Sequence, residues 1–378
     1  MTLRKIRLAC LLSLALPACS GAAPSDSGAP AVPSERPFRI SAVGTFDSPW
    51  AMAFLPDGRM LVTQKAGALI LFDPANGAKQ AVTGTPQVAS EGQGALMDIV
   101  PAPDFATSRR IYFSFSEPGE QAGKSGVALA MATLDPAAPA LRDMRVIFRA
   151  TPYTEKHGHY SGRIAFSPDG RHLFFTAGER QLFDPAQDPA VPLGKVLRLN
   201  PDGTPAAGNP LAARGFHPAV WSYGHRNLLG LAFDREGRLW EMEMGPRHGD
   251  EINLIRPGLN YGWPKASMGN HYDGRAIPDH AAGDGYEPPK AYWVPAISPG
   301  GLAYYDGDLF PQWRNSLFIT GLSGQSLDRV ALDGERAAKA DHWDMGARIR
   351  AVRAGPDGAI WLLEDGEGGR LLRLTPSA

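Results

Sequence analysis

Two histidines and an arginine stand close together in the stretch KHGHYSGRIAFSPDG, which covers residues 156–170. His157 and His159 lie in a glycine-containing turn, and Arg163 follows just before a run of strand-forming residues. An imidazole exchanges protons near neutral pH, which makes a histidine at the mouth of a strand a candidate general base. A histidine in a turn is also a common structural residue, so the bare motif leaves both interpretations open.

Polar side chains stand at the ends of other apparent strands. The stretch SEGQGALMDIVPAPDF presents Gln93 between glycines, and WSYGHRNLLGLAFD presents His225, Arg226 and Asn227 at the start of an apolar run. Imidazole, guanidinium and amide groups at such positions are candidates for binding a polar ligand. Each of them alone is more often an ordinary loop residue or part of a surface ion pair.

Two further stretches are glycine-rich or charged. EMEMGPRHGDEINLIRPGLNYGWP contains Gly245-Pro246 and then an acidic pair, Asp250 and Glu251. MGARIRAVRAGPDG alternates two arginines, so that both side chains point to the same side of a strand.

The arginine pair is Arg348 and Arg350, and no acidic residue is adjacent to it in sequence. Arginines form forked hydrogen bonds with carboxylates, and amide side chains bond carbonyl oxygens. If all these stretches converge at one place, they suit a small, rigid, polyanionic ligand.

One unit recurs six times along the chain: an apolar strand, a turn centred on Asp-Gly or a related pair, and a second apolar strand. Proline presets φ, aspartate bonds the backbone ahead, and glycine accepts a positive φ. The turns are roughly 45 to 70 residues apart, which is the period of propeller blades with variable loops. The copies occupy residues 51–64, 98–117, 163–179, 230–243, 301–321 and 352–365.

This repeat predicts an all-β chain folded as a six-bladed β-propeller, in which packed sheets bury the faces that one hairpin cannot. The strand FRISAV at residues 38–43 is expected to pair with the last blade and close the ring. Tandem sandwich domains are the alternative, but no linker divides residues 38–378. Because propellers bind ligands at one end of the central channel, the polar stretches from five repeats are expected to meet there.

The N-terminus reads as a targeting segment followed by a linker. Residues 1–19 combine a basic start with a short apolar run that ends in Leu-Pro-Ala-Cys, which resembles a bacterial lipoprotein cleavage box. In that interpretation Cys19 carries a lipid; ordinary secretory cleavage is the alternative. Residues 20–37 are rich in Ser, Ala, Pro and Gly and predict a disordered linker. We therefore expect an exported, periplasmic protein that a lipid could anchor to the outer membrane.

Composition excludes some classes of partner and chemistry. A net charge of −1 gives no reason to expect nucleic acid. The only cysteines are Cys10 and Cys19, both in the leader, so the domain predicts no disulfide and no thiol catalysis.

Six stretches in order, over residues 46–374, resemble the PQQ-dependent glucose/sorbosone dehydrogenases, and most closely their soluble aldose sugar dehydrogenases. They are GQGALMDIVPAPDF, HYSGRIAFSPDG, GKVLRLNPDGTPAAGNP, YGHRNLLGLAFD, GPRHGDEINLIRPGLNYGWP and LFPQWRNSLFITGLSGQSL. The resemblance implies a six-bladed propeller that oxidises aldose sugars at C1 to the lactone. It also implies PQQ and Ca²⁺ as cofactors and an external electron acceptor.

The resemblance implies roles for particular residues. His159 matches the catalytic base, which takes the proton of the anomeric hydroxyl while hydride leaves C1; His157 has no implied role. Arg226 matches the arginine that holds the quinone oxygen. Gly245 and Pro246 match backbone carbonyls that bind a calcium ion touching PQQ, where the ion acts as a Lewis acid. The remaining positions that match cofactor-binding residues, beside His159 and Arg226, are Gln93, Asn227, Arg348 and Arg350.

Four positions depart from the pattern of the glucose enzymes. Glu179 replaces an aspartate that orients the histidine, and Ser323 falls near a lysine that contacts PQQ. Met244 replaces a His or Gln before Gly-Pro, and Ala351 replaces an aspartate after the arginine pair. These differences favour the aldose sugar branch or an altered substrate pocket.

Two other functions fit a six-bladed propeller. A calcium-dependent lactonase would need side-chain carboxylates and amides that converge on the metal. A non-catalytic propeller that binds glycans or proteins would not need a base and several arginines at one mouth. Neither the sugar nor the oligomeric state follows from the sequence, although residues 265–292 are expected to shape the rim of the site.

Overall fold

The computed structural model describes residues 36–377. The expected signal peptide, Cys19 and nearly all of the expected linker lie outside the described residues. Strands account for 48% of the structure and helices for 4%, which confirms the all-β prediction. Within residues 36–377, no helix combines the length and the apolar character needed to cross a membrane.

The strands form six antiparallel four-stranded sheets, which we number as blades 1 to 6 in chain order. Blade 1 contains β2 (Pro49–Phe54), β3 (Met60–Gln64), β4 (Leu69–Asp73) and β5 (Ala78–Val82). Blade 2 contains β6 (Leu96–Pro101), β7 (Arg110–Pro118), β8 (Ser125–Asp135) and β9 (Ala140–Thr154). Blade 3 contains β10 (Ser161–Phe166), β11 (Leu173–Ala177), β12 (Lys195–Leu199) and β13 (Val220–Tyr223).

The second half of the chain repeats this arrangement. Blade 4 contains β14 (Leu228–Phe233), β15 (Leu239–Glu243), β16 (Asp250–Ile255) and β17 (Ala291–Trp293). Blade 5 contains β18 (Pro299–Tyr305), β19 (Ser316–Gly321), β20 (Ser326–Asp333) and β21 (Arg336–Asp344). Blade 6 contains β22 (Ile349–Ala354), β23 (Ile360–Glu364), β24 (Gly369–Pro376) and β1 (Phe38–Phe46). Short helical turns are α1 (Phe105–Ser108), η1 (Asp184–Ala186), η2 (Ala212–Arg214) and η3 (Pro311–Trp313).

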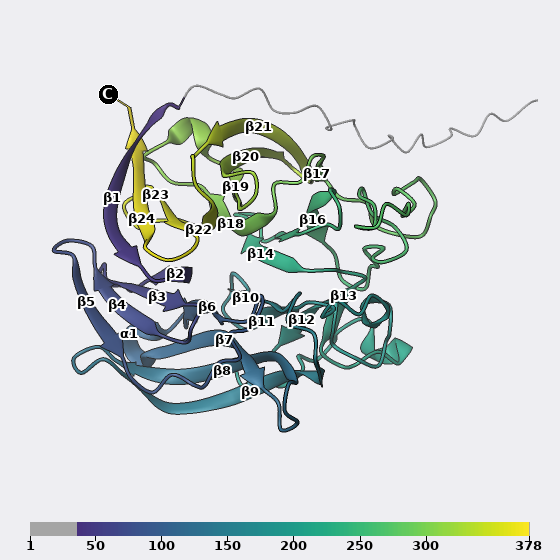
Figure 1. Ribbon diagram of the computed structural model, residues 1–378, viewed down its shortest axis with the longest axis horizontal. Coiled ribbons are helices and arrows are strands. Elements are labelled where there is room, and N and C mark those ends of the chain that lie inside the picture. The colour runs from purple at the N-terminus through teal and green to yellow at the C-terminus, as the bar shows by residue number, and fades with distance from the viewer. Residues whose placement is uncertain (1–35, 378) are drawn as a thin grey trace, which may run out of the picture.

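The first strand of each blade lies at the centre of the ring, as Figure 1 shows for β2, β6, β10, β14, β18 and β22. First strands of neighbouring blades contact one another around the whole ring. Each of the six repeats found in the sequence corresponds to the first two strands of one blade. The prediction of a six-bladed β-propeller is therefore confirmed.

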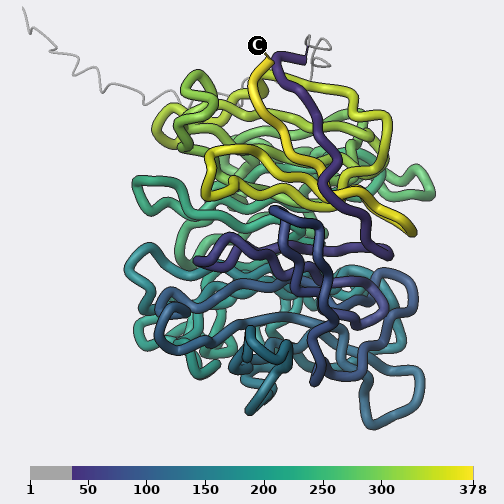
Figure 2. The backbone as a smooth tube through the Cα atoms, turned by 90° about the vertical axis from the view of Figure 1, so that its left-hand side faces the viewer, coloured from purple at the N-terminus to yellow at the C-terminus, as the bar shows by residue number. Residues whose placement is uncertain are grey.

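The ring closes between the two ends of the described chain. Strand β1 pairs antiparallel with β24, from Phe38 opposite Pro376 to Phe46 opposite Gly369. Figure 2 shows these N-terminal and C-terminal segments side by side, in purple and yellow. The expected pairing of FRISAV with the last blade is confirmed.

The turns between the first two strands use the chemistry that the repeat predicts. In blade 3, Asp169 Oδ1 accepts a hydrogen bond from the backbone N–H of Arg171 at 3.1 Å. Gly170 has a φ of +69°, which glycine adopts without a steric cost. These turns fix the register of the inner hairpins and so fix where the first strands begin.

Apolar side chains fill the space between neighbouring blades. Between blades 5 and 6, the ring of Phe38 packs edge-on against Trp343 at 5.3 Å and Trp313 at 6.0 Å. All three side chains are buried. Strand β1 therefore contributes to the core as well as to the hydrogen bonds that close the ring.

Candidate active site

A cavity of about 450 Å³ lies where the first strands of the blades begin. Its walls come from all six blades, so it occupies one end of the central channel, as the sequence predicts for the binding site. Four of the six residues expected to bind the cofactor are among its lining residues, namely Gln93, Asn227, Arg348 and Arg350; His159 and Arg226 are not, although their sequence neighbours Tyr160 and Asn227 line it.

The two arginines share one carboxylate. Nε of Arg348 donates to Oδ2 of Asp365, and Nε of Arg350 donates to Oδ1, each at 2.9 Å. The pair has no acidic neighbour in sequence, but it has one in the folded structure. Strand β23 pairs with β22 and places Asp365, which follows β23, next to the two arginines. Burial raises the pKa of Asp365, but Arg350 and Arg348 outweigh burial and hold this pKa below its usual value.

The lining residues carry a net positive charge. Arg348, Arg350 and Lys65 are cationic, and Asp365 is the only acidic residue among the described residues that line the cavity. Three positive charges minus one negative charge leave two. Nζ of Lys65 donates to the backbone oxygen of Gly92 at 2.8 Å, which ties it to the loop that carries Gln93. Lys65 was not among the predicted site residues, because no motif marks it in the stretch VTQKAG.

His159 is held from two sides. Its Nδ1 pairs with Oε1 of Glu179, and both side chains are buried. The backbone N–H of His159 donates to Oε1 of Gln93 at 2.7 Å. The second oxygen of Glu179 accepts the backbone N–H groups of Leu182 at 2.5 Å and Phe183 at 2.6 Å. The glutamate that replaces the family's aspartate therefore reaches the histidine and orders the loop after β11.

The surroundings favour a neutral imidazole and an ionised carboxylate. Burial, aided by the nearby Arg226 charge, lowers the pKa of His159 although Glu179 raises it. Burial raises the pKa of Glu179, but its hydrogen bond with His159 and the charges nearby lower it overall. A neutral imidazole whose Nδ1 is bonded to a carboxylate has Nε2 as the nitrogen that accepts a proton.

The backbone around His159 is in an unusual conformation. His159 has a φ of +49° and Ser161 a φ of +64°, in the left-handed region that non-glycine residues rarely occupy. A Cβ atom at Gly178 would lie 2.0 Å from the backbone oxygen of His159, so only glycine fits there. Strained residues of this kind concentrate at functional sites, where surrounding contacts hold them.

Arg226 lies beside the histidine loop. Its Nη1 donates to the backbone oxygen of Met244 at 2.8 Å, and its Nη2 donates to Oη of Tyr272 at 3.4 Å. The guanidinium carbon lies 5.3 Å from the ring centre of Trp263. Tyr272 belongs to the loop 265–292, so this loop reaches Arg226 as expected for a segment at the rim.

Gly245 and Pro246 line a small hollow of about 10 Å³, together with Arg226, Glu243 and Glu251. This space has room for a single water-sized atom. Oδ1 of Asp250 accepts the backbone N–H of Gly245 at 2.9 Å and so fixes this turn. The lining residues include two that carry carboxylates, Glu243 and Glu251, and the peptide groups of Gly245 and Pro246, which are ligand types that Ca²⁺ takes, so the residues present fit the expected ion.

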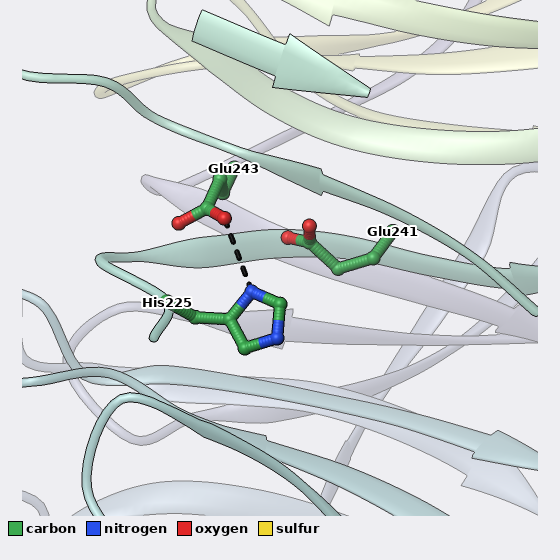
Figure 3. Close-up of side chains that lie close together, drawn as sticks. All are labelled: His225, Glu241 and Glu243. Carbon is green, nitrogen blue, oxygen red and sulfur yellow. Dashed lines mark hydrogen bonds and ion pairs between the residues drawn. The ribbon is translucent and has the colours of Figure 1, made fainter. Parts of the chain in front are cut away.

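A second polar group is buried within blade 4, where Figure 3 shows His225, Glu241 and Glu243 close together. Their ligand atoms lie within 4.8 Å of one another, with Nδ1 of His225 3.1 Å from Oε1 of Glu243. Burial raises the pKa of Glu241 well above its usual value. We call these three residues the blade 4 cluster; none of them lines the 450 Å³ cavity.

The other residues discussed from the sequence lie around these groups. His157 is half-buried, with Nε2 3.3 Å from Oε2 of Glu91 on the surface. Oγ of Ser323 donates to Oγ of Ser298 at 2.7 Å. Met244 lines the cavity. Ala351 is buried between blades 1 and 6. The glucose enzymes have an aspartate at this position; here Asp365 places a carboxylate beside the arginine pair instead.

Comparison with known proteins agrees with this geometry. The family model described as glucose/sorbosone dehydrogenase matches residues 46–373. Aldose sugar dehydrogenase YliI of Escherichia coli (strain K12) is 40% identical over 338 residues, which cover 87% of this chain and 90% of that protein. Quinoprotein glucose dehydrogenase B of Acinetobacter calcoaceticus is 26% identical over 409 residues, 86% of this chain and 85% of that protein.

A solved structure supports the same relationship. The PQQ-bound form of an aldose sugar dehydrogenase from Streptomyces coelicolor matches with a TM-score of 0.76 and 31% identity, covering 92% of this chain and 100% of that one. The matches extend over nearly all of the propeller and include its site. The chain therefore belongs to the glucose/sorbosone dehydrogenase family.

Proposed function

We propose that this protein is a PQQ-dependent aldose sugar dehydrogenase that oxidises the sugar at C1 to the lactone. The observation that carries the proposal is the buried His159–Glu179 pair beside a cavity whose lining has a net positive charge. The names of relatives in the family, which include aldose sugar and quinoprotein glucose dehydrogenases, support the same reaction class.

In this reaction His159 is the general base. Glu179 holds the ring through Nδ1, so Nε2 takes the proton of the anomeric hydroxyl as the hydride leaves C1. Loss of one proton and one hydride converts the hemiacetal into the lactone. The lowered pKa of His159 keeps the ring neutral and able to accept this proton at neutral pH.

The cavity residues suit a flat, tricarboxylated cofactor. Arg348, Arg350 and Lys65 would hold the carboxylates, while Gln93 and Asn227 offer amides to ring carbonyls or nitrogens. PQQ held there would supply a quinone able to accept the hydride, with an external acceptor for its two electrons. Lys65 takes the part that a lysine near Ser323 would have played.

Gly245 and Pro246 would hold the calcium ion through their backbone oxygens, with Asp250 fixing the turn. The ion would supply Lewis-acid assistance to the quinone. Arg226, next to this hollow, would provide a fixed positive charge where negative charge develops. Chelation should therefore abolish activity, and Ca²⁺ added with PQQ should restore it.

A lactonase is less well supported. Among the described residues, the group of three His, Asp or Glu side chains whose ligand atoms converge is the blade 4 cluster, and its His225 and Glu241 have no exposed surface. A substrate has no access to a metal at that position.

The experiment is a titration of the apoprotein with PQQ in the presence of Ca²⁺, followed by absorbance and by sugar-driven reduction of a dye. We expect saturable binding and dye reduction that requires sugar, PQQ and Ca²⁺ together. Lactone hydrolysis without dye reduction would support the lactonase instead, and binding of sugar without any turnover would support a glycan-binding propeller.

A further inference from the structure

Three charged side chains fill the channel beneath the cavity. They are Asp98 of β6, Arg163 of β10 and Arg353 of β22, which we call the channel cluster. Arg163 and Asp98 are only 3% and 1% exposed. Oδ1 of Asp98 lies 3.5 Å from Nη1 of Arg163 and accepts a hydrogen bond from Nη2 of Arg353 at 3.1 Å.

The channel cluster also bonds to the three blades that do not contribute a side chain to it. Nε of Arg163 donates to the backbone oxygen of Leu229 in β14 at 2.6 Å, and Nη2 donates to that of Gly300 in β18 at 2.5 Å. Nε of Arg353 donates to the backbone oxygen of Met52 in β2 at 3.2 Å. The cluster thus connects the first strands of all six blades.

Arg163 lies directly behind the wall of the cavity. Its guanidinium carbon is 4.0 Å from the ring centre of Trp50, and Trp50 and Leu229 both line the cavity. Burial lowers the pKa of Arg163 to about 10, which still leaves the guanidinium charged at neutral pH. Two guanidinium groups and one carboxylate leave one net positive charge in the cluster, of which Arg163 and Asp98 are buried and Arg353 is partly exposed.

We propose that Arg163 is a positioning residue for the cofactor: it fixes Trp50 and Leu229 as the floor of the cavity, and the channel cluster places positive charge beneath that floor. The inference rests on the proposed function, since the ligand that this charge and this flat floor suit is an anionic, planar one such as PQQ. The charge of Arg163 is buried and therefore weakly screened by salt, so it acts on a ligand that Arg163 does not touch, whereas the Arg353 side chain is 25% exposed and its charge is screened more strongly.

The test compares folded apoproteins by their affinity for PQQ at fixed Ca²⁺, measured by absorbance, and by their unfolding temperature. Arg163→Met removes the charge and the hydrogen bonds at similar volume, and Arg163→Lys keeps the charge. The control is Arg329→Met in β20, which breaks a partly buried ion pair with Asp341 far from the cavity. We expect Arg163→Met to weaken PQQ binding about tenfold or more. The variant lacks the charge beneath the floor and the hydrogen bond that holds Leu229, and it no longer contacts the ring of Trp50 through a guanidinium.

Arg163→Lys should recover part of the lost affinity, and Arg329→Met should bind PQQ as the wild type does even if it unfolds earlier. Wild-type affinity in folded Arg163→Met would overturn the proposal and leave the cluster with a purely structural role.

If Arg163→Met does not fold, Arg353→Met decides, because it removes one charge and leaves the contacts of Arg163 with Trp50, Leu229 and Gly300. Weaker binding there supports the placement of positive charge beneath the floor, and unchanged binding contradicts that part of the proposal. Failure of the wild-type apoprotein to bind PQQ would instead contradict the proposed function itself.

Discussion

At the scale of single residues, the position of His159 can be tested against its neighbour in the same turn. His159→Ala should lower kcat by about 10²–10⁴-fold, the usual effect of losing a general base, while the protein stays folded and binds PQQ. His157→Ala should have a much smaller effect, because the His157 ring pairs with the exposed Glu91 and its bond to Gln93 is made by the backbone oxygen, which the variant keeps. Steady-state kinetics at saturating PQQ measure both variants, and equal or reversed losses would show that the base is misassigned.

The pKa of His159 gives a second prediction at this scale. Only the neutral ring accepts a proton, so kcat/KM falls as the ring becomes protonated on the acidic side. Since burial and Arg226 lower the pKa of His159 from its ordinary 6.5, the acidic fall of kcat/KM should have its midpoint below 6.5. A pH profile of the wild type measures this midpoint. Glu179→Gln removes a group that raises this pKa, so any remaining activity should fall at still lower pH; a shift to higher pH would contradict the assignment.

Which residues meet at the site could be predicted only in part. Gln93, Asn227 and the arginine pair were found because each stands at the start of a first strand in a recognisable stretch. Asp365 and Lys65 were not, because a single acid or lysine in a turn carries no signal in one sequence. Their role depends on which blades are neighbours, and that is a property of the closed ring.

At the scale of elements, the loop after β11 connects the base to the rim of the site. Glu179 bonds the backbone of Leu182 and Phe183, and the ring of Phe183 stacks on Trp263 at 5.7 Å while remaining 43% exposed. An exposed aromatic ring held rigidly beside the base is suited to stack on the apolar face of a sugar.

Phe183→Ala should therefore raise the KM for sugar about three- to tenfold and change kcat little, since the loss affects binding and not the proton transfer. The matched control is Met144→Ala in β9, another exposed apolar side chain, at 37% exposure, on the outer edge of blade 2. Sugar saturation curves at fixed PQQ measure both. An unchanged KM in the Phe183 variant would place the sugar elsewhere on the rim.

The inner hairpins were the most predictable elements, and the long loops the least. Asp-Gly turns between strand-forming runs specify local structure through φ and short-range hydrogen bonds, so six of them could be counted. The loop 265–292 has Asp-Gly turns at Asp273-Gly274 and Asp284-Gly285 but no strand-forming runs on both sides of them, and its course depends on contacts such as Tyr272 with Arg226 that lie far apart in sequence.

At the scale of the whole molecule, both proposals depend on a ring that is closed. The cavity takes its walls from all six blades, and the channel cluster joins all six first strands. Opening the ring at one place would therefore displace residues of the proposed cofactor site. The seam is between β1 and β24, where strands from the two ends of the described chain share blade 6.

Phe38 in β1 is the side chain that tests this closure. It is buried at 4% exposure and packs on Trp313 and Trp343 of the blade 5 segment, so Phe38→Ala should lower the free energy of unfolding by about 3–5 kcal/mol. Ile40 lies in the same strand but is 37% exposed, so Ile40→Ala should cost less than about 1 kcal/mol. Denaturant unfolding of the apoprotein measures both changes.

Because the cavity lies at the centre of the ring, added PQQ and Ca²⁺ should recover part of the stability lost in the Phe38 variant through binding to the folded state. Equal losses in the two variants would mean that β1 closes the ring through its backbone alone.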